Sequence, residues 1–238
     1  MHPTEKQLEN QYIIYDSSIV DDVNADDFDV EHYRENRALL GEASGRGTTY
    51  FVKRGNESCV LRHYHRGGKV ATITKDRYWW SGVYKTRSWR EWYLLVKLRD
   101  WDLPVPRAIA ARAERHGLTY RADILMEQIA DSETLSGRVL NQKLDESQWR
   151  KIGATVRRFH QRGVYHADLN AHNILLDSES NVYLIDFDKG RLRTTQRSWQ
   201  LNNLKRLERS LKKIKSGDSR VNFELQDWEC LVAGYTQL

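Results

Sequence analysis

The first half of the chain contains short apolar runs that are typical of β-strands. Residues 48–52 read Thr-Thr-Tyr-Phe-Val and residues 58–62 read Ser-Cys-Val-Leu-Arg, so β-branched, aromatic and aliphatic side chains dominate both. A third run, residues 124–126, reads Ile-Leu-Met and has the length of a short buried strand. These runs predict a strand-rich region that begins at about Gly41.

A different period interrupts the strands at residues 88–99. Apolar side chains there recur three and four positions apart, as they do along one face of a helix. The side chains on this predicted face are Trp89, Trp92, Tyr93 and Val96. The Leu-Pro-Val-Pro sequence at residues 103–106 ends the helix, because a proline disfavours helical backbone in the residue before it. One helix is therefore expected among the strands.

The second half of the chain changes to helices around one hairpin. Residues 146–161 have a helical apolar face, and Asp145 with Gln148 three residues later forms a capping-box pattern at its start. The predicted face consists of Trp149, Ile152, Val156 and Phe159. Residues 174–176 and 182–185 are apolar runs separated by polar turn residues, which predicts a hairpin.

Two more helices are expected in the tail, where apolar residues again follow a helical period. They are Leu201, Leu204, Leu207 and Leu211 in one helix, and Trp228, Leu231, Val232 and Tyr235 in the other. The order of elements predicts an α+β chain, with an antiparallel, strand-rich N-terminal lobe and a reduced, mainly helical C-terminal lobe. We expect residues 1–40 to extend the first lobe, residues 41–130 to form it, and residues 131–238 to form the second.

Composition and charge narrow the class of protein. The 238 residues are 39% hydrophobic and 30% charged, as in an ordinary globular protein, and the net charge is +5. An excess of Lys and Arg favours anionic partners such as ATP, nucleic acid or an acidic membrane surface. Cys59 and Cys230 are too far apart to suggest a zinc site or a disulfide framework, which suits a reducing cytoplasm. No signal peptide or spanning segment is recognisable, so any membrane contact is expected to be peripheral.

The strongest chemical signal is residues 166–173, His-Ala-Asp-Leu-Asn-Ala-His-Asn, followed after the predicted hairpin by Leu-Ile-Asp-Phe-Asp. Phosphoryl transfer requires a carboxylate that orients the acceptor hydroxyl and takes its proton, and oxygen ligands that hold Mg²⁺ on the phosphates. Asp168 suits the first task, and Asn173 and Asp186 suit the second. The ordered set resembles the catalytic loop and metal-binding aspartate of the protein-kinase-like superfamily. This resemblance implies a two-lobed kinase fold that uses ATP and Mg²⁺.

The N-terminal lobe offers candidates for holding the nucleotide. Gly45, Arg46 and Gly47 lie between two predicted strands, where glycines would let the backbone approach the phosphates of ATP. Two glycines also mark many ordinary turns, so this signal depends on its position in the chain. Glu127 follows the Ile-Leu-Met run, where a kinase hinge would bind adenine, mostly through backbone groups.

A kinase also needs a cation on the next strand, paired with a carboxylate on the inserted helix. Val-Leu-Arg at residues 60–62 takes the place of the usual Val-Ala-Ile-Lys, which makes Arg62 the candidate and Glu91 its ionic partner. Arginine is always charged and can bind a phosphate or carboxylate through two N–H groups. In the alternative interpretation, Arg62 is a solvated strand residue and Lys69 or Lys75 supplies the charge.

Three departures from the protein-kinase pattern indicate a different acceptor. Asp188 replaces the glycine of the D-F-G pattern, and Asn170 replaces the lysine that usually follows the catalytic aspartate. Only 52 residues follow Asp186, and no Ala-Pro-Glu sequence occurs among them. A long activation segment and a peptide-binding helical lobe do not fit in this length. A small-molecule or glycan acceptor is therefore favoured over a protein.

Several segments resemble one kinase family more closely. They are residues 45–51, 61–68 (Leu-Arg-His-Tyr-His-Arg-Gly-Gly), 75–78, 103–106 and 168–176 (Asp-Leu-Asn-Ala-His-Asn-Ile-Leu-Leu). From about Gly41 to its end the chain is similar to the lipopolysaccharide core kinase family, among its Kdo kinases, where Kdo is 3-deoxy-D-manno-octulosonic acid. The resemblance implies transfer of the γ-phosphate of ATP to the 4-hydroxyl of a Kdo sugar on lipid A. It also implies work at the cytoplasmic face of a bacterial inner membrane.

Cations alternate with aromatic residues in the first lobe. The cations and histidines are Arg62, His63, His65, Arg66, Lys69, Lys75, Arg77 and Arg87, and the aromatics are Tyr64, Tyr78, Trp79, Trp80 and Trp89. Such a combination suits an anionic glycolipid or membrane surface. The partner that we expect is therefore Kdo-lipid A on a membrane, with no nucleic acid, and the oligomeric state is not predicted.

Other functions remain open from the sequence. Within the same fold, the chain could be a heptose kinase or a small atypical protein kinase of the RIO type. A pseudokinase that binds nucleic acid or serves as a scaffold is a third alternative, because basic and aromatic residues also suit RNA. It is the least favoured, since Asp168, Asn173 and Asp186 are all present.

Overall fold

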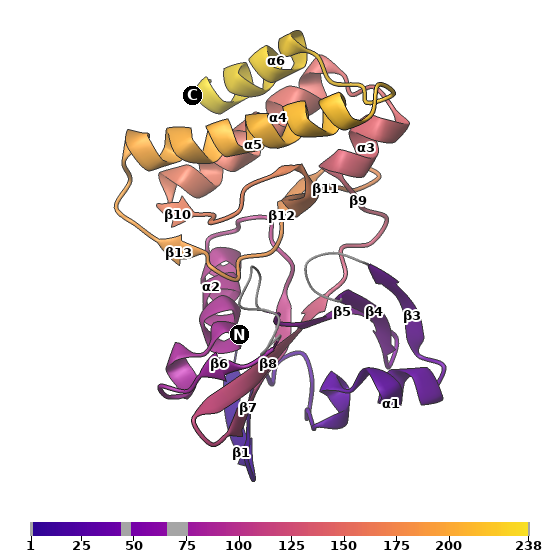
Figure 1. The fold of residues 1–238 in the computed structure, drawn as a ribbon, viewed down its shortest axis with the longest axis vertical. Coiled ribbons are helices and arrows are strands. Elements are labelled where there is room, and N and C mark those ends of the chain that lie inside the picture. Colours follow the sequence, from indigo (N-terminus) through magenta and orange to yellow (C-terminus); the bar gives the residue numbers. More distant parts are fainter. Residues whose placement is uncertain (1, 44–48, 66–75, 238) are drawn as a thin grey trace. The chain divides into compact units, whose positions relative to one another are not determined.

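A computed structural model describes residues 2–43, 49–65 and 76–237 of the chain (Figure 1). Two compact units form within it, and each is described separately. The first contains residues 1–97 and 106–128, and the second contains residues 98–105 and 129–238.

The first unit is built on one antiparallel sheet. Its strands are β1 (Pro3–Leu8), β2 (Gln11–Asp16), β3 (Leu39–Ala43), β4 (Thr49–Arg54), β5 (Glu57–His63), β6 (Tyr78–Trp79), β7 (Ala108–His116) and β8 (Thr119–Glu127). They pair in the order β1-β2-β7-β8-β5-β4-β3, and β6 pairs with β8. The hydrophobic core of this unit includes Ile13 of β2, Val52 of β4, Leu61 of β5 and Leu125 of β8. The predicted strands around residues 48–52, 58–62 and 124–126 are therefore present.

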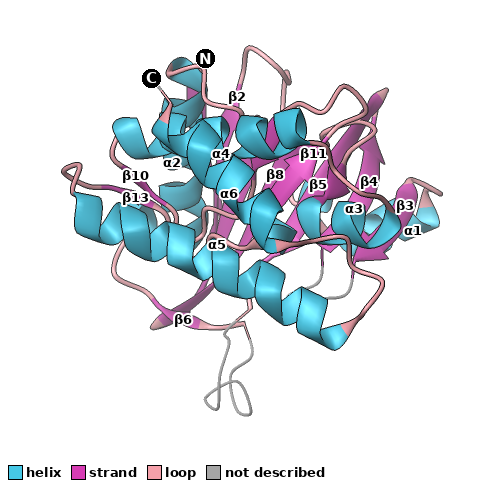
Figure 2. Ribbon diagram, turned by 90° about the horizontal axis from the view of Figure 1, so that it is seen from above, coloured by secondary structure: helices cyan, strands magenta, loops and turns pink. Residues whose placement is uncertain are grey.

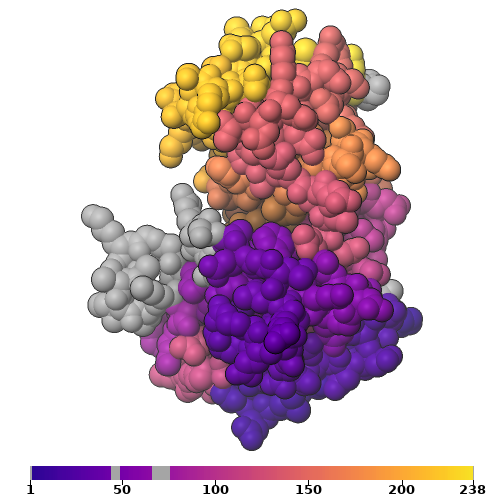
Figure 3. Space-filling model, turned by 90° about the vertical axis from the view of Figure 1, so that its right-hand side faces the viewer, coloured from indigo at the N-terminus to yellow at the C-terminus, as the bar shows by residue number. Residues whose placement is uncertain are grey.

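The acidic first 40 residues belong to this unit, and they contain strands that the sequence did not predict. β1 and β2 form a hairpin, and β2 pairs with β7 inside the sheet. In Figure 3, the indigo N-terminal residues and the violet residues that follow form one continuous surface. β1 is an edge strand with a mostly exposed, polar sequence, so it has no apolar run that would reveal it.

Two helices accompany the sheet, α1 (Val30–Glu35) and α2 (Arg87–Asp100). The predicted helix at residues 88–99 is confirmed as α2, but its predicted face is wrong at Tyr93. Trp89 and Trp92 are buried, whereas Tyr93 is 41% exposed and donates its hydroxyl hydrogen to Glu5 Oε1 at 3.0 Å. A tyrosine has a polar tip, so it is accommodated where one end of the side chain stays wet.

The second unit is mainly helical. Its helices are α3 (Leu135–Asn141), α4 (Glu146–Gln161), α5 (Arg197–Gly217) and α6 (Leu225–Thr236). Its short strands are β9 (Glu133–Thr134), β10 (Val164–Tyr165), β11 (Ile174–Leu176), β12 (Val182–Leu184) and β13 (Arg191–Leu192). The predicted hairpin is β11–β12, in which Ile174 pairs with Leu184. In α5, Leu204, Leu207 and Leu211 are buried as predicted, whereas Leu201 is 40% exposed.

Helix α4 begins where its capping pattern predicts. The Asp145 side chain accepts a hydrogen bond from the backbone N–H of Gln148 at 2.8 Å, and Gln148 Oε1 accepts from the N–H of Asp145 at 2.9 Å. This reciprocal pair satisfies two N–H groups that a helix start leaves without partners. The capping box predicted from the sequence is confirmed.

Glycines allow α4 and α6 to approach each other closely, and Figure 2 shows these helices side by side. A Cβ atom added at Gly153 of α4 would lie 1.9 Å from the carbonyl oxygen of Leu231, and one added at Gly234 of α6 would lie 2.1 Å from that of Arg150. No side chain fits at either position without separating the helices.

The chain therefore has a mixed α and β fold with an antiparallel sheet, as the sequence predicted. Among the helices of the described residues, none has the length and apolar character needed to cross a membrane.

Candidate active site

The loop that carries Asp168 is fixed by two amide side chains that follow it in the chain. Asn170 Nδ2 and Asn173 Nδ2 both donate to the carbonyl oxygen of Asp168 at 2.9 Å. Asn170 Oδ1 also accepts from the N–H of His172 at 2.8 Å, which caps the short 3₁₀ turn η4 (Ala171–Asn173). Asn170, noted in the sequence only as a departure from the lysine of protein kinases, therefore helps to set the backbone at Asp168.

His166 is hydrogen-bonded through both ring nitrogens, and one of these bonds is to the same loop. Its Nε2 donates to the carbonyl oxygen of Ile185 at 2.9 Å, and its Nδ1 accepts from the N–H of Asp168 at 3.2 Å. This bonding requires a neutral ring, and burial lowers the pKa of His166 because it disfavours the charged form. The ring also contacts Phe187, with 4.7 Å between centroids. His166 is thus a buried support that links the catalytic loop to the segment around Asp186.

Helix α5 approaches the loop with three polar side chains. Asn203 Nδ2 donates to the carbonyl oxygen of His166 at 3.0 Å, and Ser210 Oγ accepts from the N–H of Ala171 at 3.2 Å. Between them, Arg206 binds the carboxylate of Asp168. Positions 203, 206 and 210 lie on one side of a helix, next to the buried leucines. Residues 203–210 of α5 thus contact the catalytic loop at positions 166, 168 and 171.

Arg206 is the functional candidate that sequence reasoning missed. Its Nε and Nη2 atoms lie 2.9 and 2.8 Å from Oδ1 of Asp168. Both side chains are partly exposed, 47% for Arg206 and 40% for Asp168. The guanidinium therefore fixes one carboxylate oxygen and leaves the group accessible to a substrate. The only sequence signal was an arginine beside a leucine face, which many surface helices have.

Asn173 and Asp186 are held together by the β11–β12 hairpin. The N–H of Ile185 donates to the carbonyl oxygen of Asn173 at 3.1 Å, so Asp186 directly follows a residue bonded to Asn173. The backbone of Asp186 has a φ of 63°, in the left-handed region that few residues other than glycine adopt. The next residue, Phe187, is buried and stacks on Phe159 with 5.9 Å between centroids. Packing of Phe187 thus helps to hold Asp186 in this uncommon conformation.

The side-chain chemistry of Asn173 and Asp186 fits Mg²⁺. This ion prefers oxygen ligands and is usually held by one or two carboxylates together with substrate phosphates. Asn173 uses its amide nitrogen to bind the Asp168 carbonyl, which leaves its amide oxygen as the ligand atom, and Asp186 contributes a carboxylate. The roles of Asp168, Asn173 and Asp186 stay predictions, but the structure brings their backbones together.

The first unit contains the predicted cation and carboxylate pair. Arg62 on β5 and Glu91 on α2 form an ion pair, and Tyr64 donates its hydroxyl hydrogen to the same carboxylate at 2.7 Å. Glu91 is 1% exposed. A buried carboxylate requires such partners, because an uncompensated buried charge is strongly unfavourable. The alternative cations, Lys69 and Lys75, lie outside the described residues.

The structure gives less support to the other residues predicted to bind the nucleotide. Gly45, Arg46 and Gly47 also lie outside the described residues. Glu127 is the last residue of β8, and its backbone N–H donates to the carbonyl oxygen of Arg107 at 2.9 Å. That donor is engaged in the sheet, so a contact between adenine and Glu127 has to use another group. The adenine-binding role of Glu127 stays a prediction.

The aromatic residues predicted for a membrane surface are divided by the structure. Tyr64 and Trp89 are 3% and 1% exposed, so they belong to the core. Arg87 lies over the rings of Tyr64 and Tyr78, with distances of 5.5 and 4.7 Å to the centroids. Trp79 is 71% exposed. The alternation of cations and aromatic residues in the sequence therefore arises partly from cation–π contacts inside the unit and partly from surface residues.

A phosphotransferase needs an aspartate suited to act as a base next to oxygen ligands for Mg²⁺. Asp168, with Asn173 and Asp186, fits this requirement. The sequence profile of the lipopolysaccharide kinase (Kdo/WaaP) family matches residues 30–235. The chain belongs to this family, as the sequence resemblance indicated, and the predicted phosphotransferase class is confirmed.

Known proteins of similar sequence span nearly the whole chain. A protein of Haemophilus influenzae (strain 86-028NP) named 3-deoxy-D-manno-octulosonic acid kinase is 39% identical over 239 residues, which cover 97% of this chain and 98% of the relative. A protein of Vibrio parahaemolyticus with the same name is 43% identical over 204 residues, covering 86% and 85% of the two chains. A third protein of that name, from Photobacterium profundum, is 40% identical and covers 96% of each chain.

Proposed function

We propose that the protein transfers the γ-phosphate of ATP to the 4-hydroxyl of a Kdo residue on lipid A, a step of lipopolysaccharide inner-core synthesis. The observation that carries this proposal is the near full-length similarity to relatives named 3-deoxy-D-manno-octulosonic acid kinase. A heptose kinase or a small protein kinase of the RIO type is the alternative within the fold.

In the proposed reaction, the oxygen of the acceptor hydroxyl bonds to the γ-phosphorus of ATP, and Asp168 accepts the proton of that hydroxyl. The bond between that phosphorus and the β–γ bridging oxygen breaks, and ADP leaves. Arg206 holds Oδ1 of Asp168, so Oδ2 is the atom that receives the proton. Mg²⁺, when bound, neutralises charge on the phosphates, and Asn173 and Asp186 are the residues that would hold it.

In this proposal, residues of the first unit bind ATP. The proposed fold is the two-lobed protein-kinase-like one, in which the first unit supplies nucleotide-binding residues and the second supplies the catalytic residues. Arg62, kept in position by Glu91, contacts the α- and β-phosphates. Gly45, Arg46 and Gly47 cover the phosphates, and the segment at Glu127 binds adenine.

The proposed location is the cytoplasmic face of the inner membrane, with peripheral attachment. Two considerations support it. The proposed acceptor is anchored in a bilayer by its acyl chains, and ATP is a cytoplasmic substrate. An enzyme that uses both has to work at the surface of that membrane.

The direct test is mass spectrometry of Kdo-lipid A after incubation with the protein, ATP and Mg²⁺. We expect a mass gain of one phosphate, with phosphorus-coupled NMR placing it on the 4-oxygen of Kdo. Parallel reactions should contain a heptosylated acceptor and a mixture of peptides. Phosphate on heptose or on peptides, with none on Kdo, would overturn the proposal.

A further inference from the structure

One helix of the second unit is strongly basic. Helix α5, the long orange helix of Figure 1, contains seven Lys and Arg residues and a single acid, Glu208. Its net charge is therefore +6, whereas the complete chain has a net charge of +5. The remaining residues taken together carry a net charge of −1. Among the helices of the described residues, α5 therefore has the largest net positive charge.

Three of these cations form a row that faces solvent. Lys205, Arg209 and Lys213 are four residues apart, so they lie above one another on the same side of the helix. All three are exposed, and within the described part of the chain their side chains have no hydrogen-bond or ion-pair partner. Like charges at this spacing repel one another, which destabilises an isolated helix slightly. A row that is unfavourable by itself is explained if an anionic partner covers it.

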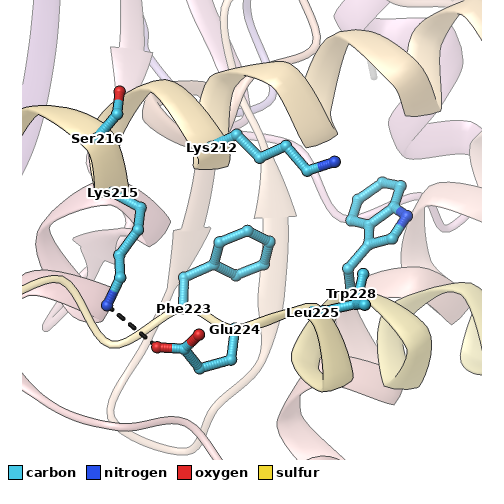
Figure 4. A pocket seen from close by; sticks show the side chains of 7 residues that line it. All are labelled: Lys212, Lys215, Ser216, Phe223, Glu224, Leu225 and Trp228. Atoms are coloured by element: carbon cyan, nitrogen blue, oxygen red, sulfur yellow. Dashed lines mark hydrogen bonds and ion pairs between the residues drawn. The ribbon is translucent and has the colours of Figure 1, made fainter.

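An apolar hollow lies beside the C-terminal end of the row. Phe223, Leu225 and Trp228 line this hollow, and Figure 4 shows Lys212 of α5 extending toward Trp228 while Lys215 pairs with Glu224 at 3.1 Å. The hollow has a volume of about 240 Å³, and Leu225 is 65% exposed. An exposed leucine and a half-buried tryptophan next to lysines are a combination found where proteins rest on the headgroup region of a bilayer.

We infer that α5 and this hollow form the surface by which the protein docks on an anionic phospholipid membrane. Lys205, Arg209 and Lys213 bind the lipid phosphates, and Leu225 with Trp228 enters the headgroup boundary. A nucleic acid fits less well, because single strands are held by exposed aromatic platforms and the one aromatic residue of α5, Trp199, is buried. The inference rests on the proposed function, in which the acceptor is a membrane lipid.

Docking through α5 has a consequence for the active site. Arg206, next to Lys205 on the same helix, binds the Asp168 carboxylate. The row faces solvent on one side of α5, and Arg206, on the neighbouring side, contacts the proposed catalytic base Asp168. Binding of the row to lipid phosphates brings Asp168 close to the surface from which the sugar of the acceptor projects.

The test is co-sedimentation of the full chain with vesicles of phosphatidylglycerol and phosphatidylethanolamine, compared with vesicles of phosphatidylcholine. The unmodified protein is expected to bind the anionic vesicles alone, and to release them as salt is raised. The triple variant Lys205→Gln, Arg209→Gln, Lys213→Gln should bind about 100-fold more weakly, since each cation contributes about tenfold or less. A matched control, Lys53→Gln, Lys85→Gln, Lys143→Gln, removes the same charge from exposed positions elsewhere and should bind normally.

The inference is overturned if the unmodified protein ignores charge on the vesicles, or if the two triple variants bind alike. Stronger binding to single-stranded RNA than to anionic vesicles, lost in the α5 variant, would also overturn it. Thermal unfolding of both variants checks that they fold. Because sedimentation requires neither ATP nor acceptor, its outcome is independent of whether Kdo is the sugar that is phosphorylated.

Discussion

Helices α4 and α5 are the two longest helices of the second unit, and they use their polar residues in opposite ways. Each of the four Lys and Arg side chains of α4 has a hydrogen-bond partner within the unit. The partners of Arg150, Lys151, Arg157 and Arg158 are Glu146, Asn181, the Tyr235 carbonyl and the Asp102 carbonyl. In α5, the exposed cations of the row face solvent, and Arg206 binds the catalytic candidate Asp168.

The difference separates a helix that holds the unit together from a helix whose polar side chains contact the loop of the candidate base. Helix α4 has a capping box, a continuous buried face and a close contact with α6. Helix α5 begins without a side-chain cap and directs Asn203, Arg206 and Ser210 at the catalytic loop. Changes in α4 should therefore alter stability, and changes in α5 should alter catalysis or membrane binding.

The largest effect on stability is expected from Gly153→Ala in α4. The new methyl group would lie 1.9 Å from the Leu231 carbonyl oxygen, so α4 and α6 would have to separate. Overpacking of this kind costs about 3 kcal/mol or more, which lowers the melting temperature by roughly 6–12 °C. Gly217→Ala at the end of α5 is the control, because nothing lies within 4 Å of its added Cβ. Equal melting temperatures for the two variants would show that the helices do not depend on this contact.

The next effect is on catalysis, in the variant Arg206→Gln. Loss of the guanidinium that positions the Asp168 carboxylate should lower kcat about 10- to 100-fold. Because the ion pair is exposed and contributes at most about 1 kcal/mol to stability, the KM for ATP and the melting temperature should be nearly unchanged. Arg206→Lys should restore part of the rate, because it returns the charge without the planar geometry. Arg150→Gln in α4 removes a similar charge and should leave kcat normal. If both arginine variants lose the same activity, Arg206 has no specific role.

A smaller effect concerns acid stability, which α4 influences through His160. Burial lowers the pKa of this histidine to about 4, so the folded protein keeps it neutral while the unfolded chain takes up a proton below about pH 6.5. Stability should therefore fall on the order of 2 kcal/mol as the pH decreases from 6.5 to 4. His166, whose pKa burial also lowers, contributes in the same direction. Melting temperatures of His160→Gln across this range should vary less with pH, and an unchanged pH dependence would refute the assignment.

The smallest effect is expected at the start of α4. Asp145→Ala removes the side chain that accepts from the Gln148 N–H, which should lower the free energy of unfolding by about 1 kcal/mol. Chemical denaturation measures this change. The rate of phosphate transfer should remain normal, since Asp145 has no contact with the catalytic loop. A loss of rate without a loss of stability would contradict the division between the two helices.

Helix α4 and the β11–β12 hairpin could be predicted from the sequence because their signals are local. The residues that cap α4 are three positions apart, and the hairpin strands are joined by five polar residues. Asp168, Asn173 and Asp186 could be named for the same reason, since their order and spacing lie within one short stretch.

The role of Arg206 could not be predicted, because it depends on an approach between residues 38 positions apart. The face of α2 was misjudged at Tyr93 for a related reason. Its ring fits the helical period, but a hydroxyl partner on β1 keeps it at the surface. Strand β1 was missed because it lies at the edge of the sheet, where polar residues suffice.

The central claim is that Asp168 is the catalytic base of a sugar kinase, and the variant Asp168→Asn tests it most directly. The measurement is the initial rate of phosphate transfer from ATP to Kdo-lipid A by the unmodified protein and by the variant, with circular dichroism and melting temperature compared. We predict a rate about 10²- to 10⁴-fold lower in a variant that folds normally. A folded Asp168→Asn protein that keeps more than about a tenth of the rate would contradict the claim, because a general base is worth at least about 100-fold.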